Sequence, residues 1–132
     1  MHVQTLTLLA TLSRYLQFVS HIGHHLTQGL TFFSDHAFLN ELYLAYESQY
    51  DIIAERMVGL DLFPDLANIN IDAAKALTNS TTPFATLLDI ERKFCIEVKV
   101  AMPLVSEGTA NMLAQFADDS EVRQYKINQR LK

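Results

Sequence analysis

Two carboxylates and two histidines are the side chains in this sequence best suited to metal chemistry. Asp51 and Glu55 stand four residues apart, which places both carboxylates on one face of a helix. His24 and His36 lie upstream, in a segment that holds four of the five histidines. Imidazole and carboxylate together make a mixed nitrogen and oxygen site that suits iron, manganese or zinc. Because an isolated Asp-x-x-x-Glu pair is usually a solvated helix face, the metal hypothesis depends on the histidines as well.

The spacing of these residues predicts a site shared between two chains. His36 and Asp51 are fifteen residues apart on one expected helix, a separation of roughly 22 Å. Ligands of one metal ion lie only about 2 Å from it, so these two residues cannot share an ion within one chain. A second copy packed antiparallel about a two-fold axis would bring histidines and carboxylates together, twice per dimer. The usual bundle site inside one chain uses Glu-x-x-His motifs, and this sequence contains none.

Hydrophobic periodicity predicts an all-α protein with four long helices. Apolar side chains recur at steps of three and four over residues 3–28 and 33–60, and again after Thr82-Pro83 and after Ser106-Glu107. Pro103 predicts an end or a kink near Met102. The segment between the second and third long helices has room for a short helix over residues 71–77. One long crossover and two short connections give the ferritin-like four-helix bundle.

Composition places the chain among compact globular proteins. Its 132 residues fit a single domain over residues 1–132, and the formal net charge is −5. The lone cysteine, Cys95, excludes an intrachain disulfide and fits a reducing compartment. We expect no signal peptide and no membrane-spanning segment, and therefore a cytoplasmic protein.

The same residues carry a family resemblance. The stretches that carry it read HHLTQGLTFFSDH over residues 24–36, ELY over 41–43, YDIIAER over 50–56 and EGTAN over 107–111. They resemble the Dps family, the DNA-binding proteins from starved cells, whose pattern is His, eleven residues, His, then Asp and Glu fifteen and nineteen positions on. The match is specific over residues 21–60 and looser over 106–132; elsewhere only the helical layout agrees.

The resemblance implies a ferroxidase that works in a hollow shell. It implies a dodecamer with an iron-oxidising site at each two-fold interface, where His24 and His36 of one subunit meet Asp51 and Glu55 of its neighbour. Iron would be the metal, and hydrogen peroxide the preferred oxidant. Ferric mineral would collect inside the shell and protect the cell from oxidative damage.

The sequence departs from the family pattern in three places. His25 stands where the family usually has Trp, and the chain has no Trp. Asn40 replaces a frequent Asp, which removes one candidate ligand of a second metal ion. The family leads iron through acidic three-fold pores, for which Glu107, Asn111 and Asp118, with the neighbouring Asp119, are the candidates; Asn111 again replaces a frequent Asp. Glu107 is equally well explained as an acid in the first turn of a helix.

The sequence supports three hypotheses about function. The first is a ferroxidase shell. The second is a weakly active or non-catalytic shell with a structural or DNA-protecting role. The third is a zinc-binding bundle that uses His21, His24 and His25, which would still need further ligands. DNA binding is not favoured, because the N-terminal segment holds no basic tail and the acidic net charge repels phosphates.

Overall fold

The computed structural model describes residues 3–132, and every regular element in that range is helical. Their bounds, in chain order, are α1 Val3–Leu26, α2 Phe32–Gly59, α3 Leu66–Ala74, α4 Phe84–Ala101, the 3₁₀ helix η1 Met102–Leu104, and α5 Glu107–Leu131. Among these described residues, no helix is both long and apolar enough to cross a membrane.

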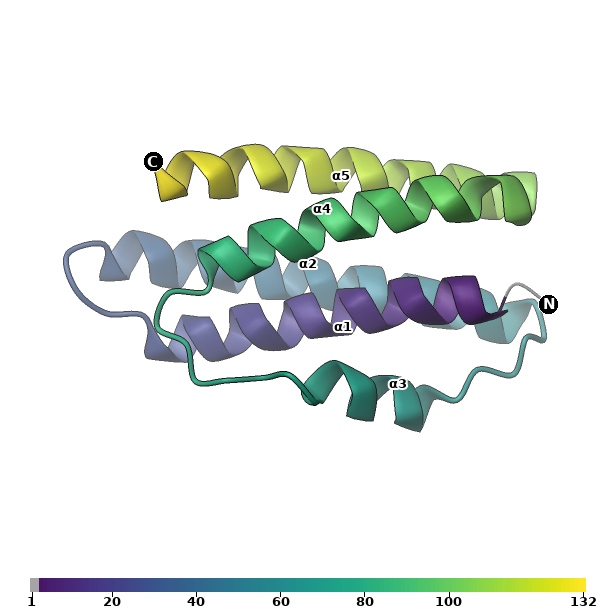
Figure 1. Ribbon diagram of the computed structural model, residues 1–132, viewed down its shortest axis with the longest axis horizontal. Coiled ribbons are helices and arrows are strands. Elements are labelled where there is room, and N and C mark those ends of the chain that lie inside the picture. The colour runs from purple at the N-terminus through teal and green to yellow at the C-terminus, as the bar shows by residue number, and fades with distance from the viewer. Residues whose placement is uncertain (1–2) are drawn as a thin grey trace.

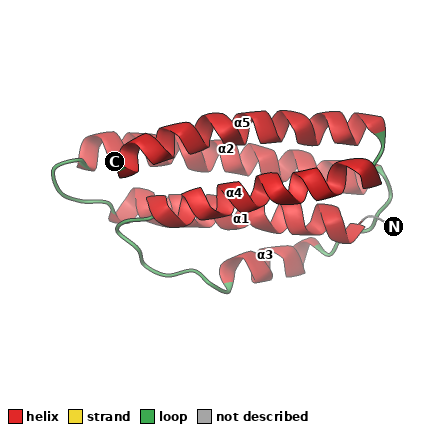
Figure 2. Ribbon diagram, turned by 45° about the horizontal axis from the view of Figure 1, so that its top comes forward, coloured by secondary structure: helices red, strands yellow, loops and turns green. Residues whose placement is uncertain are grey.

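The four long helices form a ferritin-like bundle, as predicted (Figures 1 and 2). Helices α1 and α2 are antiparallel neighbours, and so are α4 and α5. The connection between α2 and α4 runs back along the whole bundle, so these two helices point in the same direction (Figure 1). Helix α3 lies within this crossover and packs against the outside of α1. This single long crossover is what separates the fold from a simple up-and-down bundle.

Two predicted helix boundaries are confirmed by local chemistry. Helix α4 ends at Ala101, and the chain continues through Pro103 as a single turn of 3₁₀ helix. Ser106 caps α5, because its hydroxyl oxygen accepts a hydrogen bond from the backbone N–H of Thr109 at 3.3 Å. The acidic Glu107 follows in the first turn, where it faces the positive end of the helix dipole.

The predicted short crossover helix is confirmed, but its bounds were predicted too late in the chain. It begins at Leu66, five residues earlier than the expected range of 71–77, and ends at Ala74. Asp65 is the cap, since its carboxylate accepts from the backbone N–H of Asn68 at 3.0 Å. The helix forms here because Ile69 and Ala73 are both buried against the bundle, which outweighs the low helix propensity of the asparagines.

The hydrophobic core fills the space between the four long helices along their length. Its largest fully buried side chains include Tyr46, Phe94 and Met57. Leu131, the last residue of α5, lies outside this core and is 43% exposed. Cys95 is half-buried at the edge of the core, with its thiol near the backbone carbonyl of Ala117 at 3.9 Å.

Candidate metal centre

His24 and His36 form a pair of stacked imidazoles where α1 ends and α2 begins. Their ring centroids are 3.7 Å apart and the planes differ by 20°. Each Nδ1 lies 2.8 Å from the backbone carbonyl oxygen of the other histidine. Because a carbonyl oxygen only accepts, each Nδ1 must carry the hydrogen, which leaves each neutral Nε2 with a lone pair. Metal-binding histidines are oriented in this way, by donation from the second ring nitrogen to a backbone carbonyl.

The turn between the two helices holds these rings in register. Gly29 adopts φ +91°, a left-handed conformation that other residues rarely take, and its carbonyl accepts from the backbone N–H of Phe32 at 3.1 Å. The Phe32 ring then stacks on His36, with centroids 5.0 Å apart. The three rings of Phe32, His36 and His24 therefore form one continuous stack.

An ion pair between the exposed Arg130 of the last helix and the buried Asp35 secures the same turn. Arg130 of α5 donates to both carboxylate oxygens of Asp35, at 2.7 and 2.8 Å, and Thr31 donates to the same carboxylate at 2.8 Å. Hydrogen bonding from Arg130 lowers the pKa of Asp35 below its ordinary value. Sequence reasoning missed this contact, because ninety-five residues separate the partners and no local pattern connects them. It fixes the residue adjacent to His36.

Asp51 and Glu55 lie elsewhere, further along α2, and both are exposed. At about 1.5 Å per residue, Asp51 is roughly 22 Å from His36 along the helix. In the described part of the chain, no three His, Cys, Asp or Glu side chains are grouped so as to hold a metal ion. The fold thus brings the two histidines together, but it does not bring them to the two carboxylates within one chain.

The carboxylates share their helix face with exposed apolar side chains. Leu44 is 53% exposed and lies seven residues before Asp51, and Ile52 is 43% exposed and lies three residues before Glu55. Exposed apolar side chains that gather on one helix face are compatible with a contact to another chain. Arg56, the neighbour of Glu55, points to α5 instead and donates to the Thr109 hydroxyl at 3.1 Å.

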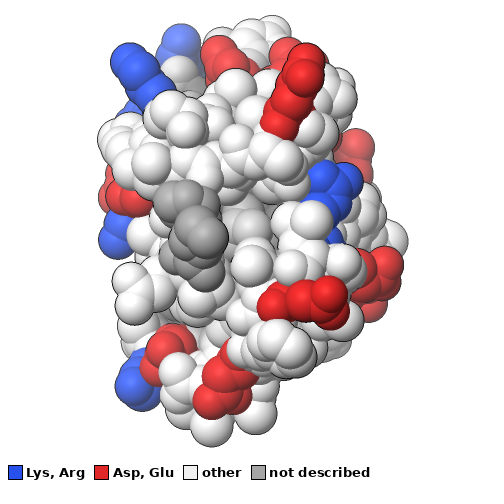
Figure 3. Space-filling view, turned by 90° about the vertical axis from the view of Figure 1, so that its right-hand side faces the viewer, with Lys and Arg blue, Asp and Glu red and all other residues white. Residues whose placement is uncertain are grey.

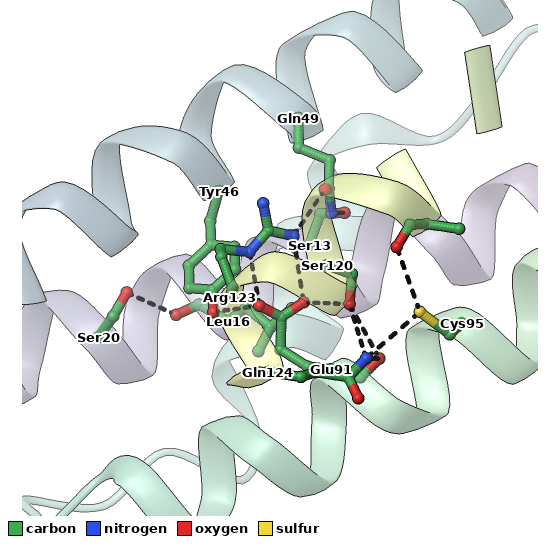
Figure 4. A network of polar contacts seen from close by, with 11 residues as sticks. Ser13, Leu16, Ser20, Tyr46, Gln49, Glu91, Cys95, Ser120, Arg123 and Gln124 are labelled. Carbon is green, nitrogen blue, oxygen red and sulfur yellow. Dashed lines mark hydrogen bonds and ion pairs between the residues drawn. The ribbon is translucent and has the colours of Figure 1, made fainter. Parts of the chain in front are cut away.

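The centre of the bundle, where ferritin-like proteins can hold metal within one chain, contains an ion pair instead (Figure 4). Glu91 is fully buried and pairs with Arg123 of α5, and it also accepts from the Tyr46 hydroxyl at 2.8 Å and from Ser120 at 2.9 Å. Burial raises the pKa of Tyr46 well above its ordinary value, so the phenol remains a donor. The guanidinium of Arg123 supplies the positive charge that a metal ion would otherwise bring to this carboxylate.

Sequence patterns could have revealed this ion pair. Glu91 stands on the apolar face of its helix, between the buried Leu87 and Phe94. Arg123 stands in the same way between the core residues Phe116 and Ile127. An acid and a base that each occupy a core position on different helices predict a buried pair.

The remaining histidines lie beside the stacked pair. His21 and His25 have ring centroids 4.9 Å apart, and Tyr43 stacks on His21 at 4.1 Å. Burial lowers the pKa of His21, and electrostatic interaction with the neighbouring rings of His25 and His24 lowers it further. Asn40, one turn after His36, accepts from the Tyr43 hydroxyl at 2.8 Å.

The candidate pore residues lie on α5. Glu107, Asn111 and Asp118 are all exposed, at spacings that place them along one side of the helix. Asp119 is half-buried and accepts from Gln115 at 3.0 Å. At the end of the bundle where α5 begins, acidic and basic side chains are interspersed (Figure 3). One chain therefore shows no continuous acidic surface on this end, and a pore would need several copies.

Comparison with known proteins supports the fold. No protein-family model and no curated protein matches the chain. A solved structure does: a Dps protein from Vibrio cholerae O1, described as a member of a broad superfamily of ferritin-like diiron-carboxylate proteins. The chain has the Dps fold. The match has a TM-score of 0.74 and 22% sequence identity, and it covers 98% of this chain and 88% of the Dps chain. It confirms the predicted resemblance at the level of the ferritin-like bundle.

Proposed function

We propose that the protein oxidises and stores ferrous iron at sites shared between two copies of the chain in a hollow shell. The observation that carries this proposal is the reciprocal bonding of His24 and His36. Both Nδ1 atoms are committed to backbone carbonyls, so both rings present an Nε2 lone pair, as metal ligands do.

The second half of the proposed site is the carboxylate face of α2. Asp51 and Glu55 are exposed among apolar side chains that a partner chain would cover. The histidine half lies where α1 ends and α2 begins, and the carboxylate half lies further along α2, so an antiparallel copy about a two-fold axis would pair each half with its complement. The Dps fold and the shared-site geometry are mutually consistent, and a shell of twelve chains is the assembly that the resemblance implies.

The ligand set suits Fe²⁺ as a substrate. Neutral imidazoles and carboxylates bind ferrous iron and leave coordination positions open for an oxidant. Two Fe²⁺ ions each give one electron to hydrogen peroxide, which yields two Fe³⁺ and two hydroxide ions. Because both electrons reach the peroxide together, no hydroxyl radical is released. The carboxylates also lower the net positive charge of the bound ions, which favours the ferric product.

One experiment tests this proposal. Fe²⁺ is added anaerobically to the purified protein, then hydrogen peroxide, while ferric absorbance and elution volume on a sizing column are followed. Rapid oxidation that leaves iron in a large soluble particle is the expected result. The variant Asp51→Asn with Glu55→Gln should keep the particle size and lose the rapid phase. If that variant oxidises iron at the wild-type rate, the site assignment is wrong.

Asn40 supports a second candidate, a shell with weak iron oxidation. Its amide oxygen is occupied by the Tyr43 hydroxyl, and an amide is a poorer ligand than a carboxylate. In that case the particle forms, but iron is oxidised only slightly faster than in buffer or at the same rate, and the role is structural. Asn40→Asp should then raise the oxidation rate, whereas a fully active wild-type protein would exclude this candidate.

A further inference from the structure

A second imidazole pair lies on α1, just before the histidine of the proposed iron site. His21 and His25 are four residues apart, so their side chains leave the same face of the helix. Their ring centroids are 4.9 Å apart and the planes are tilted by 31°. Two imidazoles that bind one ion through bonds of about 2.1 Å have centroids roughly 4.5 to 5.5 Å apart. The pair is therefore already spaced to chelate a single cation.

These two rings differ from the stacked pair in their hydrogen bonding. Across residues 3–132, neither ring of His21 or His25 hydrogen-bonds to another protein group, whereas His24 and His36 both do. Within the same range, Arg14 Nε is the one fully buried side-chain nitrogen or oxygen without a partner, so the nitrogens of the half-buried His21 are open to solvent. Both rings are free to bind an ion that arrives from solution.

The pair lines a hollow on the surface of the molecule. The rings line a surface hollow of about 420 Å³ between α1 and the end of α3, together with the apolar Phe18, Ile22, Ala74 and Leu77. Tyr43 stacks on His21 with planes 21° apart, which holds that ring in place. The Glu47 carboxylate of α2, which accepts from the Gln17 amide at 3.4 Å, contributes negative potential at His21. Burial and the nearby His25 and His24 have larger effects on that ring, and these lower its pKa.

We propose that His21 and His25 form a second metal site, which takes Zn²⁺ or a divalent cation of the same ligand preference. Imidazole nitrogen selects such ions over Mg²⁺ and Ca²⁺, and Zn²⁺ binds more tightly than Fe²⁺ to a given nitrogen site. With two protein ligands, water completes the coordination, so the ion exchanges with solution rather than holding the fold together. The site depends on contacts within one chain, and it does not depend on the proposed iron chemistry.

The test counts Zn²⁺ bound per chain in the assembled protein, by equilibrium dialysis followed by metal analysis. Four proteins are compared: wild type, His21→Gln with His25→Gln, Asp51→Asn with Glu55→Gln, and the combination of all four substitutions. Loss of the histidine pair should remove about one Zn²⁺ per chain in both backgrounds. The rate of iron oxidation should be unchanged by the histidine substitutions alone.

The design separates this proposal from the iron-site proposal. If the histidine substitutions leave bound Zn²⁺ unchanged, the second site does not exist, whatever the iron assay shows. If the wild-type protein does not oxidise iron, but the His21→Gln with His25→Gln variant binds less Zn²⁺ than wild type, the iron proposal fails and this proposal stands. The single variant His25→Gln, at an exposed position, should lose the same Zn²⁺ and keeps the test valid if the double variant folds poorly.

Discussion

A mixture of two inactive variants should regain activity if the iron site is shared between chains. His24→Ala removes a histidine half, and Glu55→Ala removes a carboxylate half. In a mixed dimer, one interface site receives both defects, while the other combines an intact histidine half with an intact carboxylate half. Random equal mixing makes about half of the dimers mixed, and half of their sites are intact, so about one quarter of wild-type activity returns.

The assay is peroxide-dependent iron oxidation by co-expressed variants, with mass spectrometry to establish that both chains are present in each particle. The matched control mixes His24→Ala with His36→Ala. Both defects then fall on the same half of the site, so no pairing of chains restores it, and activity should stay at the level of the parents. Recovery near one quarter in the first mixture alone supports the shared site. No recovery in well-mixed particles would refute the shared site, because every mixed dimer would then contain one interface with an intact histidine half and an intact carboxylate half.

Three further predictions concern stability and assembly. Arg123→Leu leaves the buried Glu91 carboxylate without its partner and should lower the free energy of unfolding by about 3–5 kcal/mol, measured by urea denaturation. Asp35 has a lowered pKa when folded, so its stabilising contribution is present above about pH 4, the unfolded value, and is lost as pH falls through the folded value. Asp35→Asn should therefore melt below wild type at pH 7, and the gap should close in strong acid. Ile52→Lys, at a position exposed in the single chain, should change the free energy of unfolding by no more than about 0.5 kcal/mol yet shift elution to a smaller species.

The long helices were predictable because their signals are local. Apolar spacing reports a buried helix face directly, and Pro103 and Ser106 act on the backbone within one turn of their own positions. The short crossover helix shows the limit of such signals. Its asparagines favour a loop by intrinsic propensity, and the helix forms only because Ile69 and Ala73 meet the outer surface of α1, a contact that depends on the path of the whole crossover.

The candidate site was predictable in part for the same reason. The fifteen-residue spacing of His36 and Asp51 excludes an ion shared within one chain, because the distance between them follows from the rise per residue of the helix alone. The reciprocal bonds between His24 and His36 were not predictable, because they require two backbone carbonyls positioned by a turn. The ion pair between Arg130 and Asp35 was not predictable either. Arg130 and Asp35 lie ninety-five residues apart, and only the folded chain brings them into an ion pair.

The acidic side chains differ in whether a basic side chain of the same chain is paired with them, and this difference bears on where a metal ion could bind. In the core, Arg123 already neutralises Glu91, so an entering cation would gain no net negative charge there and would have to displace a guanidinium. On the surface, no Lys, Arg or His among residues 3–132 forms an ion pair with Asp51 or Glu55. No cation of the same chain therefore compensates these two carboxylates, on a face that a partner would cover in the proposed assembly. Burial without a cation would be costly, and in that proposal the histidine half of a neighbouring chain, loaded with Fe²⁺, would supply the compensating charge. Assembly and iron binding are thus expected to stabilise each other.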